Sequence, residues 1–221
     1  ALQWTATELE AIGETRTFIN KKVANSTTWT SEIASIISNK SRESSENPFL
    51  GKFYMNQNQS ALPTQLFFLF QRIQQIEDLK QQSLFEPVRV ADFLIEKDRL
   101  FAEVTLSPEE LDLYDKVYDH LTFDSPTPDL VIYLQAPVEI LLDRINKRGN
   151  PEERFLTSEY LERINEAYSK FFLDYDDAPL LIVNASDINL EDESNDYNLL
   201  MDSIVSNPKG KNFINPQPSI F

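Results

Sequence analysis

The stretch LVIYL at residues 130–134 decides the fold class. A continuous apolar run of this kind is typical of a strand that is buried on both faces of a parallel sheet. Pro137 then stands where a helix can begin, and Gly149 stands where that helix can end. A second apolar run, LLIV at residues 180–183, indicates another buried strand. Strands that alternate with helices predict an α/β fold with a parallel sheet.

Further elements are predicted on either side of these strands. Pro63 opens a helix at a position where its missing N–H costs nothing. The segment SPEE at residues 107–110 is a capping box with Pro at the first helical position. Another helix is predicted over residues 158–173, and short strands are predicted over residues 17–19 and 87–91.

Composition limits the classes of function. The chain has 221 residues and a formal net charge of −16, from 20 Lys and Arg against 36 Asp and Glu. This size suits one domain, or one domain with a lid. The negative charge disfavours nucleic acid and anionic membranes as partners, because binding to both relies on basic side chains. The absence of cysteine excludes disulfides and thiolate metal sites. With no apolar run long enough to span a membrane and no leader-like start, we expect a cytoplasmic protein.

The chain is poor in glycine. Its four glycines are Gly13, Gly51, Gly149 and Gly210, which are far apart in the sequence. A loop that cradles phosphates needs several glycines close together, so that backbone N–H groups can converge on the phosphate oxygens. The sequence therefore contains no intact GxxxxGK[ST] loop and no GxGxxG turn.

Two groups of residues are candidates for chemistry. Arg144 and Arg148 are four apart on one predicted helix and could close over transferring phosphates, or they could simply complement the negative end of that helix. Gln65 and Arg72 are seven apart on one helix face, and Asp98 could pair with Arg72. Gln65 could then bind the edge of a base through its amide, although a surface glutamine beside an ordinary salt bridge is the alternative.

No metal site is predicted from the residues alone. Asp174, Asp176 and Asp177 lack the glycine and the spacing of a calcium-binding loop. His120 is the only histidine, so a site made of several histidines is excluded.

Four stretches together resemble the deoxynucleoside kinase family, and in particular its bacterial deoxyadenosine/deoxyguanosine kinase branch. They are residues 46–54 (ENPFLGKFY), 63–72 (PTQLFFLFQR), 92–102 (DFLIEKDRLFA) and 144–149 (RINKRG), the last followed by Glu152 and Glu153. Each motif alone is weak, but their order and intervals over about residues 46–185 are typical of the family.

The resemblance implies a P-loop kinase-like α/β fold, with a parallel five-stranded sheet flanked by helices. The kinase-like domain would occupy residues 17–205 with a lid at about 144–157, between an extension at 1–16 and a tail at 206–221. Its reaction would be transfer of the γ-phosphoryl group of ATP, with Mg²⁺, to the 5′-hydroxyl of a deoxynucleoside. The family usually forms homodimers.

The same resemblance implies the roles of individual residues in binding the nucleoside. Gln65 would bind the base, and Arg72 with Asp98 would flank the same edge. Tyr54 and Glu153 would hold the 3′-hydroxyl of the sugar. Arg144 and Arg148 would be the arginines of the lid.

The residues expected to bind ATP depart from the family pattern. Residues 20–28 take the place of the phosphate loop, and if Thr27 aligns with the hydroxyl residue of that loop, Ser26 replaces its lysine. Val23 and Asn25 then replace glycines. A β-branched valine is strained where the backbone must be left-handed or closely approached.

The residues that align with the catalytic motifs of the family also differ from the family pattern. The general base should precede residue 46, where Glu43 is one residue out of register and Arg42 falls at the aligned position. Asp92 could still approach Mg²⁺, but Phe93 stands where the family has an arginine that contacts phosphate. A further lid arginine is replaced by Asn150.

Three functions are compatible with this pattern. The chain could be a deoxynucleoside kinase with an unusual donor site, which would use ATP and Mg²⁺. It could be a non-catalytic nucleoside-binding or scaffold protein with a kinase fold and no cofactor. It could also be an accessory subunit of a larger assembly.

Overall fold

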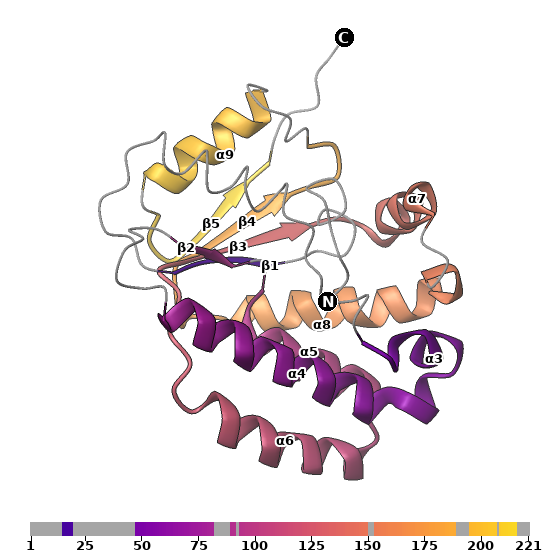
Figure 1. Ribbon diagram of the computed structural model, residues 1–221. Coiled ribbons are helices and arrows are strands. Elements are labelled where there is room, and N and C mark those ends of the chain that lie inside the picture. The colour runs from indigo at the N-terminus through magenta and orange to yellow at the C-terminus, as the bar shows by residue number, and fades with distance from the viewer. Residues whose placement is uncertain are drawn as a thin grey trace.

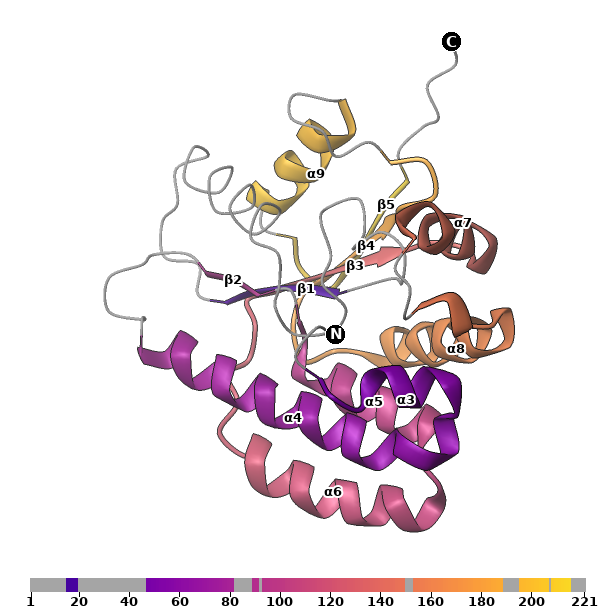
Figure 2. The same cartoon turned by 45° about the vertical axis from the view of Figure 1, so that its right-hand side comes forward.

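The computed structural model describes residues 15–19, 47–81, 89–91, 93–149, 153–188, 195–206 and 208–215. Within these ranges, helices surround one central sheet (Figures 1 and 2). The strands are β1 (Thr15–Ile19), β2 (Arg89–Ala91), β3 (Leu130–Gln135), β4 (Leu180–Asn184) and β5 (Lys211–Ile214). The helices are α3 (Leu50–Met55), α4 (Gln57–Gln81), α5 (Ile95–Thr105), α6 (Pro108–Thr122), α7 (Val138–Arg148), η3 (Glu153–Phe155), α8 (Ser158–Asp174) and α9 (Asn195–Val205).

Among the described residues, the sheet has five strands in the order β2-β1-β3-β4-β5. Strands β3, β4 and β5 are parallel, whereas β1 is antiparallel to both of its neighbours, β2 and β3. The expectation of an all-parallel sheet was therefore wrong for β1. The residues of a short strand do not encode its direction, because both kinds of ladder pair the backbone N–H and C=O groups.

The last strand corrects another prediction. Residues 206–221 were expected to form a tail outside the kinase-like domain, yet Lys211–Ile214 pairs with β4 at the edge of the sheet. Phe213 in this strand is exposed, and its neighbours Lys211 and Asn212 are polar. Short, polar edge strands are common because they discourage pairing with other chains. A strand that is short and polar also lacks the apolar run from which a strand is predicted. At the other end, β1 begins at Thr15, inside the predicted extension.

The two faces of β3 explain why residues 130–134 are continuously apolar. Leu130, Ile132 and Leu134 belong to the cluster of buried residues that includes Met201 and Ile204 of α9. Val131 and Tyr133 belong to the cluster on the opposite face, together with residues of α8. In both views α9 lies on one side of the sheet, and α4, α5 and α8 lie on the other (Figures 1 and 2).

Several local signals are confirmed. Ser107 accepts a hydrogen bond from the N–H of Glu110, whose side chain accepts one from the N–H of Ser107, so the capping box forms as predicted. Gly149 ends α7 in the left-handed conformation, with φ of 68°. Helix α8 spans Ser158–Asp174, close to its predicted range.

Pro63 does not begin its helix. Helix α4 starts at Gln57 and contains Pro63 in its second turn. The proline removes one helical hydrogen bond. Nearby side chains support the backbone here, since the Thr64 hydroxyl donates to the Ser60 carbonyl at 2.6 Å and the Asn47 amide donates to the Thr64 carbonyl at 3.3 Å. The first of these bonds lies within α4, and the second joins α4 to the segment that precedes α3.

Candidate functional site

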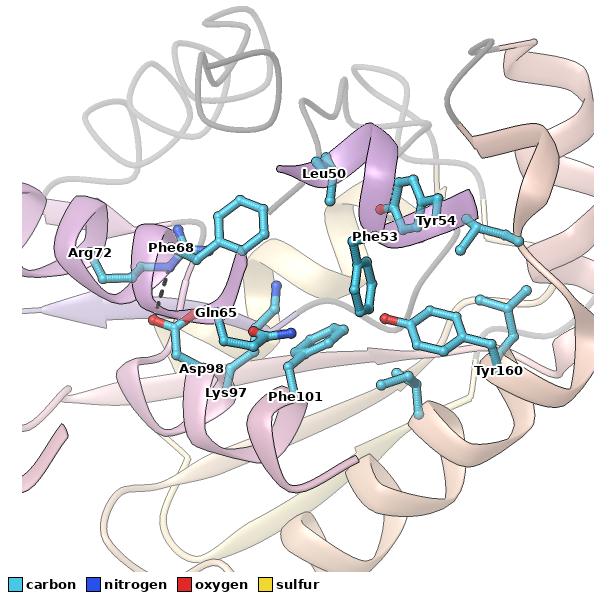
Figure 3. A pocket seen from close by; sticks show the side chains of 13 residues that line it. Leu50, Phe53, Tyr54, Gln65, Phe68, Arg72, Lys97, Asp98, Phe101 and Tyr160 are labelled. Carbon is cyan, nitrogen blue, oxygen red and sulfur yellow. Dashed lines mark ion pairs between the residues drawn. The ribbon is translucent and has the colours of Figure 1, made fainter. Parts of the chain in front are cut away.

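A cavity of about 50 Å³ lies between α3, α4, α5 and α8 (Figure 3). Its lining combines aromatic rings with a small group of polar side chains. The polar residues are Tyr54, Gln65, Arg72, Lys97 and Asp98. The other rings are Phe53, Phe68, Phe101 and Tyr160. Apolar walls with a few polar groups are typical of sites for small molecules.

Gln65 is held in one orientation by neighbouring groups. It is buried, and its amide Nε2 donates to the Thr105 hydroxyl at 3.1 Å. That hydroxyl in turn donates to the Phe101 carbonyl at 2.7 Å. Because the single hydroxyl proton of Thr105 is used on this carbonyl, Thr105 must accept from Gln65, and this assigns the amide nitrogen. The carbonyl oxygen of Gln65 then faces away from Thr105.

Arg72 and Asp98 form a buried ion pair at the same end of the cavity (Figure 3). Arg72 Nε lies 3.5 Å from Asp98 Oδ2, and their side chains are only 2% and 6% exposed. The guanidinium also lies 4.9 Å from the centroid of the Phe93 ring. Burying two charges is costly unless they remain close, so each side chain fixes the place of the other. The predicted pairing of Arg72 with Asp98 is thus present.

The two residues predicted to hold the sugar lie on neighbouring elements. Tyr54 lines the cavity from α3. Glu153 is 2% exposed in η3, which packs against α3, but it is not in the cavity lining among the described residues. The structure therefore places Tyr54 and Glu153 on neighbouring elements at one end of the cavity, and their joint role stays a prediction.

Of the two predicted lid arginines, Arg144 does not line this cavity. Arg144 extends from α7 toward the chain that follows β4, where its Nη2 donates to the carbonyls of Ala185 at 2.6 Å and Ser186 at 3.0 Å. Arg148 is the last residue of α7, and its side chain is not among those that the structure describes. A lid role for either arginine stays a prediction.

The residues predicted on the ATP side lie outside the described residues. They are Thr27, Glu43 and Asp92. Within the described part of the chain, no group of three histidine or acidic side chains could hold a metal ion.

The sequence analysis missed Lys97 and the ring of Phe101 as parts of the lining. Both lie on α5 with Asp98. Their spacing offered a signal, because residues 97 and 101 are one turn apart on a helix and therefore share a face. Lysine is usually exposed, so only its burial reveals that Lys97 faces the cavity.

A second, more open cleft of about 590 Å³ lies between α5, α6 and α8. Its acidic residues are Glu96, Glu103, Asp174, Asp176 and Asp177. Burial raises the pKa of the Glu96 carboxyl, and the carboxylates of Asp177 and Asp98 raise it further. The folded protein therefore favours the protonated form of Glu96.

This pKa shift predicts a dependence of stability on pH. The folded-state pKa of Glu96 lies above its ordinary value of 4.5, so its contribution to stability is greatest below that pH and is lost as the pH rises through the folded-state pKa. We expect Glu96→Gln to be more stable than the wild type at pH 7.5 and to lose this advantage at pH 4. Urea unfolding at both pH values measures the difference.

The control for this experiment is Glu162→Gln, which alters an exposed glutamate on α8. It should not change the pH dependence. If Glu96→Gln were less stable than the wild type at pH 7.5, the ionised carboxylate would be favourable in the folded protein, and the expectation would be wrong.

Comparison of the chain with known protein families indicates which family of enzymes carries a cavity of this kind. The family model described as deoxynucleoside kinase matches residues 12–207. The chain belongs to the deoxynucleoside kinase family. The family model covers α3, α4 and α5, which carry the five polar residues of the cavity.

Two curated relatives from Bacillus subtilis (strain 168) illustrate the similarity. A deoxyguanosine kinase is 42% identical over 125 residues, which are 56% of this chain and 60% of the relative. A deoxyadenosine/deoxycytidine kinase is 27% identical over 174 residues, which are 74% of this chain and 78% of the relative. The first alignment therefore spans about three fifths of that relative's length.

Solved structures confirm the fold. A deoxyadenosine kinase from M. mycoides with bound dCTP superposes with a TM-score of 0.62 and 22% identity, over 85% of this chain and 97% of that one. The same enzyme with bound dATP gives a TM-score of 0.64 and 24% identity, over the same shares. The P-loop kinase-like fold predicted from the sequence is confirmed. In the described part of this deoxynucleoside kinase family member, no helix has the length and hydropathy needed to cross a bilayer.

Proposed function

We propose that this chain binds a deoxynucleoside in the cavity and transfers the γ-phosphoryl group of ATP to its 5′-hydroxyl. One observation supports the proposal that the chain binds a deoxynucleoside. An oriented amide, that of Gln65, lies beside the buried Arg72–Asp98 ion pair in a cavity with aromatic walls. Family membership supports the reaction.

The polar groups at this end of the cavity suit the edge of a base. The carbonyl oxygen of Gln65 can accept from an exocyclic amine or a ring N–H, and Arg72 can donate to a ring nitrogen or an exocyclic oxygen. Asp98 can accept a further hydrogen bond while it holds Arg72. Phe68 and Phe101 line the cavity from different helices, and rings in such positions can stack on a flat base.

The sugar is proposed to lie toward α3, with Tyr54 and Glu153 at its 3′-hydroxyl. The cavity volume of about 50 Å³ has room for roughly three to five water molecules, which is less than a deoxynucleoside occupies. Binding therefore requires some of the lining side chains to move apart, as interface side chains commonly do.

Titration calorimetry with the four deoxynucleosides tests the binding site. Because the deoxyguanosine kinase relative is 42% identical and the deoxyadenosine/deoxycytidine kinase relative 27%, deoxyguanosine is the first ligand to test. We expect Gln65→Ala to weaken binding about 10-fold, since one hydrogen bond is lost and its partner on the base is left unsatisfied. The melting temperature should change little.

The matched control is Gln74→Ala on the same helix, because Gln74 is exposed and bonds only to Asp78 among the contacts resolved for it. It should leave affinity unchanged. Absence of heat with all four deoxynucleosides would refute the binding site. An unfolded Gln65→Ala variant would instead assign Gln65 a structural role.

A non-catalytic nucleoside-binding protein is the second candidate. It is favoured by residues 20–28, which contain no glycine, and by Phe93, which stands in place of an arginine. A coupled phosphorylation assay with ATP and Mg²⁺ separates the two functions. Turnover that requires the nucleoside supports the kinase, and binding without turnover supports the second candidate.

The proposal extends to a homodimer in the cytoplasm, where ATP is available. Exposed Leu173, together with Phe171 in the open cleft, leaves apolar surface along α8 that a second copy could cover. Light scattering after gel filtration should give twice the mass of the chain, and a monomer at all concentrations would contradict the dimer.

A further inference from the structure

The amide of Gln65 has its nitrogen and its oxygen in fixed places. The residue is only 4% exposed and belongs to the lining of the cavity (Figure 3). Its Nε2 donates to the Thr105 hydroxyl at 3.1 Å, whereas its amide oxygen accepts no hydrogen bond from the residues that the structure describes. Buried polar atoms normally have a partner, so this oxygen is the acceptor that Gln65 offers to a ligand.

The hydroxyl of Thr105 is itself held in one orientation. Thr105 is the last residue of α5, and its hydroxyl donates to the Phe101 carbonyl of the preceding turn at 2.7 Å. A threonine that bonds in this way keeps one of its few rotamers. Arg163 of α8 donates to the neighbouring Val104 carbonyl and so holds this end of the helix. Because a hydroxyl has a single proton, Thr105 can only accept from Gln65.

Turning the Gln65 amide over would therefore be unfavourable. The amide oxygen would then face the Thr105 oxygen, whose proton is already used, and the hydrogen bond between the two side chains would be lost. Arg72, the second polar group at this end of the cavity, is fixed as well, because its Nε lies 3.5 Å from Asp98 Oδ2 and a guanidinium can only donate. The acceptor of Gln65 and the donors of Arg72 thus cannot exchange places.

Bases differ in the order of donor and acceptor along their edge. Adenine has a donating amine on C6 and an accepting N1, whereas hypoxanthine has an accepting oxygen on C6 and a donating N1–H. Guanine has the same order as hypoxanthine at these two positions. A site with fixed hydrogen-bonding groups rejects a ligand of the wrong order, because buried polar atoms are then left unpaired. The fixed order in the cavity therefore favours one of these purines over the other.

We propose that Thr105 is a specificity-determining residue, which fixes the amide of Gln65 so that the site distinguishes adenine from a base with the donor and acceptor order of hypoxanthine. This inference rests on the proposed function. Thr105 is a positioning residue, because it acts on the base through Gln65. Its absence from the cavity lining, among the residues described, agrees with this indirect role.

Calorimetry with deoxyadenosine and deoxyinosine tests this role, because these two nucleosides differ only in the groups at C6 and N1. We expect the wild type to bind one of them at least about 10-fold more tightly than the other, which is the effect of one unpaired buried group. Thr105→Val keeps the shape of the side chain without the hydroxyl and lets the amide turn over. In this variant the ratio of the two affinities should fall below about 3-fold. Thr105→Ser keeps the hydroxyl and should keep the ratio.

The matched control is Thr122→Val. Thr122 ends α6 as Thr105 ends α5, and its hydroxyl likewise donates to the carbonyl of the preceding turn, that of Tyr118, at 2.9 Å. It does not line the cavity. The variant should therefore leave the ratio of the two affinities unchanged.

Two results would overturn the role of Thr105 and leave the nucleoside site standing. One is a wild type that binds both nucleosides equally well, and the other is a Thr105→Val variant whose ratio does not fall, whatever its two affinities. A wild-type chain that binds no deoxynucleoside would overturn the proposed function as well. If Thr105→Val fails to fold, Thr105→Ala and Thr105→Ser carry the same comparison of ratios.

Discussion

Replacing Asp98 by alanine is expected to lower the free energy of unfolding by about 3–5 kcal/mol and to abolish detectable deoxynucleoside binding. The substitution leaves the guanidinium of Arg72, whose side chain is 2% exposed, buried without this carboxylate. It also frees Arg72 to leave the end of the cavity where we place the base. Urea unfolding followed by circular dichroism measures the first effect, and calorimetry measures the second.

A double-mutant cycle separates the ion pair from the packing around it. Arg72→Met with Asp98→Ala removes both charges, and we expect it to be more stable than Asp98→Ala alone. The exposed pair of Lys116 and Asp112 on α6 gives the matched control, since Asp112→Ala should cost less than about 1 kcal/mol. If the losses in free energy of unfolding of Arg72→Met and Asp98→Ala add up to the loss of the double variant, the two side chains are not coupled.

Replacing Phe172 by alanine is expected to lower the free energy of unfolding by about 3–5 kcal/mol. Phe172 lies on α8 and is 2% exposed. Its ring centroid is 4.4 Å from that of Tyr133 on β3, with 25° between the ring planes, and it also stacks with Tyr168. Truncation would open a cavity between α8 and the sheet, which the surrounding rings cannot fill by small movements.

The adjacent residue provides the control for this substitution. Leu173 is on the same helix but 73% exposed, so Leu173→Ala should change stability by no more than about 0.5 kcal/mol. Equal losses from the two variants, measured by urea unfolding, would contradict the packing of α8 against β3.

Local signals predicted many of the elements correctly. The apolar run at residues 130–134 forms β3, the box at residues 107–110 caps α6, and Gly149 ends α7. Each of these features depends on residues that are close in the sequence. A cap needs only the first turn of its helix, and a left-handed end needs only a residue without a Cβ atom.

Part of the candidate site could also be predicted. The seven-residue spacing of Gln65 and Arg72 places them on one face of a helix, and the structure buries both in one cavity. The pairing of Asp98 with Arg72 was also proposed from the sequence, and this ion pair is present. Lys97 could not be identified in this way, because the sequence around a lysine does not say whether its ammonium is hydrated or buried.

The sequence by itself thus determined the kinds of elements, their main caps and the family to which they belong. Tertiary structure alone decided that β1 runs against its neighbours, that residues 211–214 complete the sheet and that Arg144 bonds to the carbonyls after β4. Strand direction, edge pairing and burial depend on contacts between residues that are far apart in the chain. Such contacts form only once the hydrophobic faces of β3, α8 and α9 have been brought together, and no local pattern records them.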